Sequence, residues 1–294
     1  MPYIGRFAPS PTGPLHAGSL VAALASYLDA RAHHGQWLIR IEDIDEARTV
    51  AGAAEDIFAT LHDLGMQSDG DILWQSARAM RYEYAFERLS AFVYPCGCSR
   101  KEIADSRITL ALDGAAIYPG TCRHGLAPGR IPRAWRVRVP EPDSRDDVIE
   151  VDDRWQGHLQ ESLSSTVGDF VLRRADGFWA YQLAVVVDDA EQQVTDVVRG
   201  ADLLESTVRQ VYLQRLLGYP TPRYLHVPVV TNERGEKLSK QTGAEALDRS
   251  RPVKALKDAA KALGLDVSPA TDTLPAFWAT AVPAWALRFG IGQR

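Results

Sequence analysis

Apolar and polar positions in the first part of the chain follow two different periods. Short segments at 4–8 and 37–43 predict strands, the second ending in acidic residues. Apolar positions spaced three and four apart predict helices at 16–35 and 50–65, with Gly35 at the C′ position of the first. Strand and helix therefore alternate, which is typical of an α/β protein with a parallel sheet.

The middle of the chain has a different character. Between residues 94 and 176 lie all three cysteines, several Pro and Gly turns and only short strand-like segments. We therefore predict one domain in two halves, 1–93 and 177–236, with 94–176 inserted as a subdomain and a loop with a helical segment at 237–294.

The remaining elements follow from the same periods. Long apolar runs at 178–189 and 194–200 predict buried strands. Further strands are expected at 134–139, 147–151 and 223–230, and further helices at 80–93, 201–218, 252–264 and 274–290.

Composition limits the classes of protein to consider. With 294 residues, 46% of them hydrophobic, the chain has no apolar run that could span a membrane and no secretory signal pattern. An odd number of cysteines argues against a disulfide framework, so we expect a cytoplasmic protein. The net charge of -5 counts against nucleic-acid binding, although arginines cluster at 130–138.

The segment 6–20, RFAPSPTGPLHAGSL, joins the first strand to the first helix. Helix N-termini attract phosphates, and ligands of open α/β sheets bind beyond the carboxyl ends of the strands. Prolines such as Pro9 stiffen this turn, and Gly13 and Gly18 allow a ligand to approach the backbone. His16 would face that ligand, although a lone histidine is more often structural.

A second candidate is the segment 235–243, GEKLSKQTG. Lys237 and Lys240 flank Ser239, and lysine binds phosphate as a mobile point charge. Taken alone, this pattern favours a solvated surface loop.

Together the two segments resemble the signatures of class I aminoacyl-tRNA synthetases. Residues 16–19 read His-Ala-Gly-Ser, with Ser19 in place of the second histidine of the motif, and residues 237–241 read Lys-Leu-Ser-Lys-Gln. RFAPSPTGPLH, RIEDIDEAR and VVRGADLL resemble the glutamyl branch of this class. The resemblance implies a Rossmann-type catalytic domain.

The length of the chain separates it from ordinary glutamyl-tRNA synthetases. Only 54 residues follow Lys240, so we expect no anticodon-binding domain. PSPTGPLHAGSLVAALASYLDAR and YPCGCSRKEI resemble the glutamyl-Q tRNA(Asp) synthetase family. That family activates glutamate with ATP, without requiring tRNA, and attaches it to queuosine in the anticodon loop of tRNA(Asp).

The resemblance also assigns roles in ATP binding and catalysis. His16 and Lys240, with Lys237, would stabilise the phosphates during adenylate formation, and Mg²⁺ would accompany ATP. The residues implied to contact ATP are Pro9, Thr12, Gly13, His16, Gly18, Ser19, Lys237, Ser239 and Lys240.

In the implied glutamate pocket, charged side chains of the protein bind oppositely charged groups of the substrate. Arg6 and Arg199 would read the side-chain carboxylate, and Glu42 would bind the α-ammonium group. The resemblance adds Ala8, Ser10 and Tyr181 to the pocket. Without the resemblance, the arginines could be surface ion-pair partners, Glu42 a helix cap and Tyr181 a core residue.

Cys96, Cys98 and Cys122 would supply three of the four ligands of a structural zinc site. Spacing alone favours His124 as the fourth ligand, whereas the resemblance points to Tyr118, and we expect Tyr118. The alternative is three free cysteines in a core.

The expected partners are ATP, L-glutamate and tRNA(Asp) bearing queuosine, bound by a monomer that contacts no membrane. Three alternatives stay open. They are a truncated glutamyl-tRNA synthetase that charges the tRNA 3′ end, another nucleotidyltransferase that forms a small-molecule adenylate, and a tRNA-binding module without activity.

Overall fold

The computed structural model describes residues 2–105, 117–230, 246–267 and 271–292. Within them, one sheet has the strand order β3-β2-β1-β9-β10-β6-β7 and a smaller one the order β4-β5-β8. The strands are β1 (Ile4–Phe7), β2 (Gln36–Ile41), β3 (Leu73–Trp74), β4 (Val93–Cys96), β5 (Ala134–Val137), β6 (Val148–Asp153), β7 (Gly157–Ser162), β8 (Phe170–Arg173), β9 (Asp196–Gly200) and β10 (Arg223–Val227).

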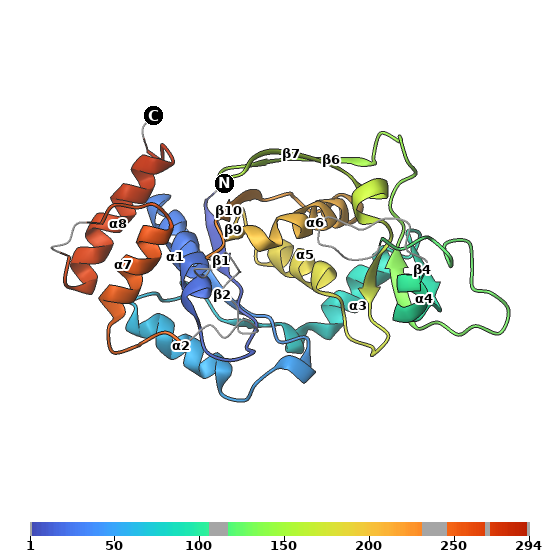
Figure 1. Cartoon of the computed structure of the whole chain (residues 1–294), viewed down its shortest axis with the longest axis horizontal. Coiled ribbons are helices and arrows are strands. Elements are labelled where there is room, and N and C mark those ends of the chain that lie inside the picture. The colour runs from blue at the N-terminus through green and yellow to red at the C-terminus, as the bar shows by residue number, and fades with distance from the viewer. Residues whose placement is uncertain (1, 106–116, 231–245, 268–270, 293–294) are drawn as a thin grey trace.

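The described helices are α1 (Ala17–Ala32), α2 (Ala53–Asp63), α3 (Ala79–Arg88), α4 (Arg100–Asp105), α5 (Tyr181–Glu191), α6 (Leu204–Leu217), α7 (Pro252–Ala262) and α8 (Leu274–Arg288). Helices α1 and α6 contact strands of the larger sheet, whereas α7 and α8 pack on α1 and α4 lies beside β4 (Figure 1). None of these described helices is both long and apolar enough to cross a membrane.

Pairing in the larger sheet is parallel from β3 to β6, and only the last strand, β7, runs antiparallel to its neighbour. The α/β fold with a parallel sheet, predicted from the alternation of periods, is confirmed. The chain crosses from β1 to β2 on one side, while β9 pairs with β1 on the other. The carboxyl ends of β1, β2, β9 and β10 therefore meet at one edge, around a topological switch point.

Helix α1 is buried between the sheet and the C-terminal helices. It contacts β1 and β9 on one side and α7 and α8 on the other (Figure 1). Leu20, Leu24 and Leu28 are almost completely buried, which explains why the helix is apolar around most of its circumference. Its buried Asp29 accepts hydrogen bonds from Tyr3, Arg154 and Trp285, so the acid joins β1, the β6–β7 turn and α8.

The end of α1 differs from the sequence prediction by one residue. His34, with φ of 53°, occupies the left-handed C′ position that we predicted for Gly35. The amide of Gly35 instead bonds to the carbonyl of Ala30 at 2.8 Å, which completes a Schellman motif. A Cβ on Gly35 would lie 2.5 Å from the carbonyl oxygen of Tyr3. Gly35 therefore permits close chain approach, rather than supplying the positive φ.

The strand predicted at 178–189 is wrong, because this segment is helical from Tyr181 onward, as part of helix α5. Its apolar run, Leu183 to Val187, is buried along its whole length between α3 and α6. A short, fully buried apolar run does not distinguish a helix from a strand. Here tertiary packing outweighs the β preference of the valines, and the two acids that follow, Asp188 and Asp189, find buried partners.

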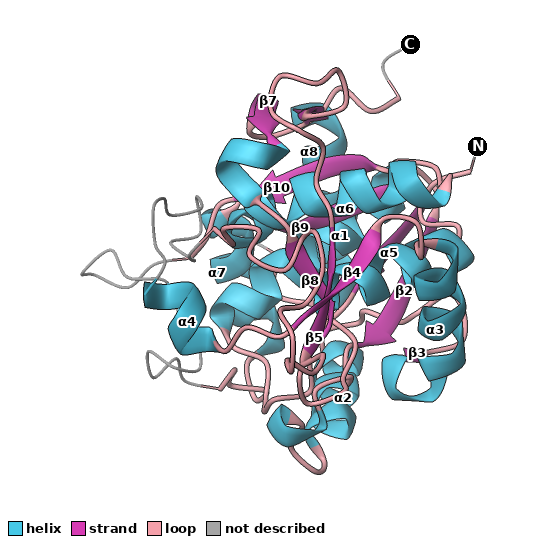
Figure 2. Ribbon diagram, turned by 90° about the vertical axis from the view of Figure 1, so that its right-hand side faces the viewer, coloured by secondary structure: helices cyan, strands magenta, loops and turns pink. Residues whose placement is uncertain are grey.

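Residues predicted as an inserted subdomain contribute to both sheets. Strands β4, β5 and β8 form the separate antiparallel sheet at one end of the molecule, which faces the viewer in Figure 2. The β6–β7 hairpin instead extends the larger sheet beside β10. A small cluster of Tyr94, Cys96, Tyr118 and Cys122 packs separately from the two main cores. The domain boundaries at 94 and 176 stay a prediction.

Candidate functional site

A cleft of about 600 Å³ opens at the carboxyl ends of β1, β2, β9 and β10. It is lined by all six residues predicted to bind glutamate, namely Arg6, Ala8, Ser10, Glu42, Tyr181 and Arg199. Five of the residues predicted to bind ATP also line it, namely Pro9, Thr12, His16, Gly18 and Ser19.

The other residues assigned to ATP differ in position. Gly13 belongs to the same turn, where its φ of 133° requires glycine, but it does not line the cleft. Lys237, Ser239 and Lys240 lie outside the described residues, so their roles stay predictions.

The described residues on both sides of 231–245 lie close to the turn that joins β1 to α1. Val230 lines the cleft. On the other side, Ala246 forms a β-bridge with His16, and the amide of Leu247 bonds to the carbonyl of Leu15 at 3.1 Å. The described residues on either side of 231–245 thus lie next to the first signature segment.

His16 caps the N-terminus of α1. Its Nδ1 accepts a hydrogen bond from the backbone N–H of Ser19 at 3.3 Å, and its Nε2 lies 3.0 Å from the Ser19 hydroxyl. Ser19, which replaces the second motif histidine, therefore fixes the orientation of the imidazole at the wall of the cleft.

Arg6 is buried in an ion pair that the sequence did not suggest. Asp189 of α5 accepts from Arg6 Nε at 3.0 Å and from Arg6 Nη2 at 3.3 Å. The same carboxylate accepts from the fully buried Arg40 at 2.7 Å. Burial acts to raise the pKa of Asp189, but Arg40 and Arg6 lower it to about 2. Arg6 is therefore held rigidly and largely neutralised by a protein carboxylate.

Glu42 lies beside Arg40 and Arg6, but these positive charges only partly offset the cost of burying its carboxylate. Its side chain is 8% exposed, and Arg40 Nη2 donates to it across 3.4 Å. Burial raises the pKa of Glu42 to about 7, because it outweighs the attraction of Arg40 and Arg6. A substrate ammonium group would supply the positive charge that this carboxylate lacks.

Arg199 is buried among neutral partners. Its Nε donates to His226 at 3.0 Å, its Nη1 to Gln210 at 2.9 Å and its Nη2 to the Thr207 hydroxyl at 2.8 Å. Burial lowers the pKa of His226, which keeps that imidazole neutral. Within the described residues, Arg199 therefore brings a positive charge without an acidic hydrogen-bond partner to the cleft wall, which suits an anionic substrate group.

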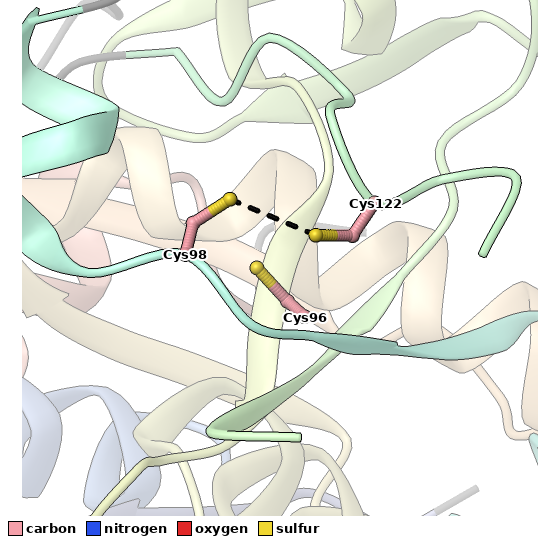
Figure 3. A group of neighbouring side chains, drawn as sticks. All are labelled: Cys96, Cys98 and Cys122. Atoms are coloured by element: carbon pink, nitrogen blue, oxygen red, sulfur yellow. Dashed lines mark hydrogen bonds between the residues drawn. The ribbon is translucent and has the colours of Figure 1, made fainter. Parts of the chain in front are cut away.

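The cysteine cluster, Cys96, Cys98 and Cys122, forms a second candidate site away from the cleft. Figure 3 shows the three thiols pointing toward one another. Their sulfurs lie within 4.8 Å of one another, and those of Cys98 and Cys122 are 3.6 Å apart. Zinc–sulfur bonds of about 2.3 Å in a tetrahedron place sulfurs about 3.8 Å apart, so the thiols fit such an ion.

The Tyr118 hydroxyl lies against the cysteine cluster. It is 3.4 Å from the sulfur of Cys96 and 3.5 Å from that of Cys98, and it accepts the amide N–H of Cys122 at 2.8 Å. Arg136 stacks on the Tyr118 ring, 4.0 Å from its centroid, and provides positive charge beside the thiols. In the described structure the exposed His124 is not part of the group that could share a metal ion.

The sequence analysis missed the residues that hold Arg6 and Arg199. These residues are Asp189, Thr207, Gln210 and His226, and together with Arg40, which shares Asp189 with Arg6, they come from four different elements. Only Arg40 left a signal, because a charged residue inside the apolar strand WLIRIED requires a buried partner.

The comparisons agree with this geometry. The sequence matches the family model described as tRNA synthetases class I (E and Q), catalytic domain, over residues 4–263. The fold and the cleft are those of a class I synthetase catalytic domain.

Curated relatives match nearly the whole chain. A protein named glutamyl-Q tRNA(Asp) synthetase from Janthinobacterium sp. (strain Marseille) is 65% identical, covering 98% of each chain. One of the same name from Ralstonia nicotianae is 61% identical, covering 98% of this chain and 92% of its own. The chain belongs to the glutamyl-Q tRNA(Asp) synthetase family.

Solved structures give the same fold. The glutamate-tRNA synthetase of Elizabethkingia anophelis matches with a TM-score of 0.77 at 25% identity, over 96% of this chain. This chain spans only 65% of the length of that protein.

Proposed function

We propose that this protein activates L-glutamate with ATP in the absence of tRNA and then transfers it to queuosine in the anticodon loop of tRNA(Asp). The observation that carries the proposal is the cleft itself. It combines Arg6, Arg199 and Glu42 at the switch point of a class I synthetase fold, beside the capped N-terminus of α1. The names of the 61–65% identical relatives support the acceptor.

The first step joins an oxygen of the glutamate α-carboxylate to the α-phosphorus of ATP. The bond from that phosphorus to the bridging oxygen breaks, and pyrophosphate leaves with its electrons. Positioning and electrostatic stabilisation supply most of the catalysis in such reactions. His16 and the first turn of α1 hold the phosphates, and Lys240 with Lys237 stabilises the leaving pyrophosphate. When bound with ATP, Mg²⁺ would supply positive charge to the phosphates.

Charge complementarity explains the choice of amino acid. The carboxylate of Asp189 accepts hydrogen bonds from Arg6 and Arg40 and offsets part of their positive charge, whereas the hydrogen-bond partners of Arg199 are neutral. The pocket thus offers one surplus positive charge for a side-chain carboxylate, and Glu42 offers a carboxylate for the α-ammonium group. Glutamine would leave the donors of Arg199 partly unpaired in a buried site, which disfavours it.

The cysteine cluster has a structural role in this proposal. Cys96, Cys98, Cys122 and Tyr118 would enclose one zinc ion with no position left for substrate. The ion would hold the turn after β4 against the sheet of β5 and β8, the region that we assign to tRNA contact. We further propose that the protein acts as a cytoplasmic monomer.

Transfer of labelled glutamate tests the proposal. The protein is incubated with ATP, labelled glutamate and tRNA(Asp), either with queuosine or with unmodified guanosine at that position. Label should appear only on the queuosine-containing tRNA, and after nuclease cleavage it should be recovered in the anticodon-loop fragment and not on the terminal adenosine. Label on the terminal ribose of either tRNA would instead identify a glutamyl-tRNA synthetase that charges the 3′ end.

A further inference from the structure

Arg199 is oriented by a short chain of buried side chains that ends at Asp153. Arg199 and His226 lie side by side on the paired strands β9 and β10. Arg199 Nε donates to His226 Nε2 at 3.0 Å, and His226 Nδ1 lies 2.7 Å from Asp153 Oδ2. His226 is completely buried and does not line the cleft.

The partners define which ring nitrogen of His226 carries the proton. A guanidinium N–H can only donate, so His226 Nε2 must accept. The single proton of the neutral imidazole then lies on Nδ1 and points to Asp153. The Thr207 hydroxyl, which accepts from Arg199 Nη2, lies 3.1 Å from the same Nε2 and can donate to it.

Asp153 is itself rigidly placed. Its carboxylate accepts the backbone N–H groups of Trp155, Gln156 and His226 at 2.8–3.2 Å, besides the imidazole. The acid ends strand β6, at the turn of the hairpin beside β10. The position of Arg199 in the cleft therefore depends on a carboxylate in another part of the sheet.

We propose that Asp153 and His226 are positioning residues for substrate recognition, which rests on the function proposed above. Asp153 holds His226 in the tautomer that accepts from Arg199. Three of the five N–H donors of Arg199 are occupied by His226, Gln210 and Thr207, and two remain for the side-chain carboxylate of glutamate. The wrong tautomer would present N–H to N–H and turn the guanidinium away.

Two neutral variants separate positioning from simple packing. His226→Gln places an acceptor oxygen near the position of Nε2 and loses the bond to Asp153. His226→Asn places a donor near the position of Nδ1 and keeps that bond, but it loses the acceptor for Arg199. Asn is one methylene smaller than Gln, so a packing role would lower the thermal midpoint more for Asn and would raise the KM values for both substrates together.

ATP–pyrophosphate exchange without tRNA, at varied glutamate and varied ATP, supplies the readout. His226→Asn should raise the KM for glutamate about tenfold or more, the size of a lost hydrogen bond to a charged group. The KM for ATP should stay unchanged, and His226→Gln should recover much of the glutamate affinity. Equal effects of the two variants, or parallel increases in both KM values, would overturn the proposal.

Asp153→Asn provides a second test if a His226 variant does not fold. It permits either tautomer of His226, so the KM for glutamate should rise while that for ATP does not. An unchanged KM for glutamate in folded Asp153→Asn protein would reject the positioning role. Absence of glutamate-dependent exchange in the unaltered protein would reject the proposed function, which makes the two failures distinguishable.

Discussion

In the cleft, charged side chains are held by other side chains of the protein, whereas the thiols of the cysteine cluster contact mainly one another and Tyr118. Asp189 holds Arg6 and Arg40, and His226 holds Arg199. In the cluster, the sulfurs of Cys98 and Cys122 lie 3.6 Å apart. The cleft is therefore organised by the protein's own side chains, whereas the three thiols of the cysteine cluster are placed so that they could hold a metal ion.

This difference suggests that the cleft binds substrate and that the cysteine cluster stabilises the surrounding structure. Changes in the cleft should alter catalysis and leave the cysteine cluster unaffected. Changes in the cysteine cluster should loosen the structure around β4 and β5 and leave glutamate activation intact, since the two sites are built from different elements.

The largest effect is expected for Arg199→Ala, which removes the surplus charge of the cleft. Losing a buried charge-assisted carboxylate contact should lower kcat/KM for glutamate by about 10²–10³-fold. The KM for ATP should change little. Arg215→Ala, on the exposed side of α6, is the matched control and should behave as the unaltered protein. Loss of glutamate activation in the control as well would contradict this role.

Cys98→Ser tests the opposite half of the comparison. Losing one thiolate should lower zinc affinity by at least about 10–100-fold. Hydrogen exchange should accelerate at 93–98 and 117–137 but not in α1. Glutamate-dependent ATP–pyrophosphate exchange should persist, while transfer of glutamate to tRNA declines. Metal analysis that finds no zinc in the unaltered protein, or uniform loosening of the whole chain, would argue against a structural metal there.

Tyr118→Phe identifies the fourth ligand. If the phenolic oxygen contacts the metal, this variant should bind zinc about tenfold or more weakly, as judged by chelator competition. His124→Ala should bind as the unaltered protein does. The reverse ranking of the two variants would assign the fourth position to His124, as spacing alone suggests.

The pH dependence of glutamate binding is the smallest effect. Below pH 7, Glu42 becomes protonated in the empty cleft and loses its attraction for the α-ammonium group, so the KM for glutamate should rise by up to about tenfold per pH unit. Glu42→Gln should raise KM at pH 8 and flatten this profile. The control, Glu46→Gln, alters an exposed carboxylate and should retain the profile.

Glu42 also links function to stability. Its pKa in the folded protein lies above the ordinary value of 4.5, so folding favours the protonated form and the charged form costs stability above pH 7. Glu42→Gln should therefore raise the thermal midpoint of the empty protein at pH 8. A lowered midpoint would indicate that Glu42 is stabilised by its neighbours.

Local signals predicted the parallel sheet, α1 and the turn that carries His16, whereas Arg6, Glu42 and the other residues of the glutamate pocket came from the family resemblance. His16 begins a helix, Arg6 lies near the end of a strand and Glu42 follows one, and parallel strand ends converge at one edge of the sheet. The partners of the arginines were not predictable, since Arg6 and Asp189 are 183 positions apart and helix α5 was taken for a strand. No periodicity carries such long-range information.

At the cysteine cluster, too, the sequence pattern did not predict which side chain lies next to the thiols, although the residues concerned are close together in the sequence. Spacing favoured His124, yet the turn after Tyr118, with Gly120 at φ of 77°, brings the Tyr118 oxygen to the amide of Cys122 at 2.8 Å. The path of the backbone, rather than the count of intervening residues, decides which side chain faces the thiols.

Glutamate-dependent ATP–pyrophosphate exchange in the complete absence of tRNA tests the central claim most directly. If the cleft is organised by its own side chains, exchange should proceed with glutamate, fail with glutamine, and gain nothing essential from added tRNA. Exchange that begins only after tRNA is supplied, or that accepts glutamine equally well, would contradict a preformed cleft selective for an acidic side chain.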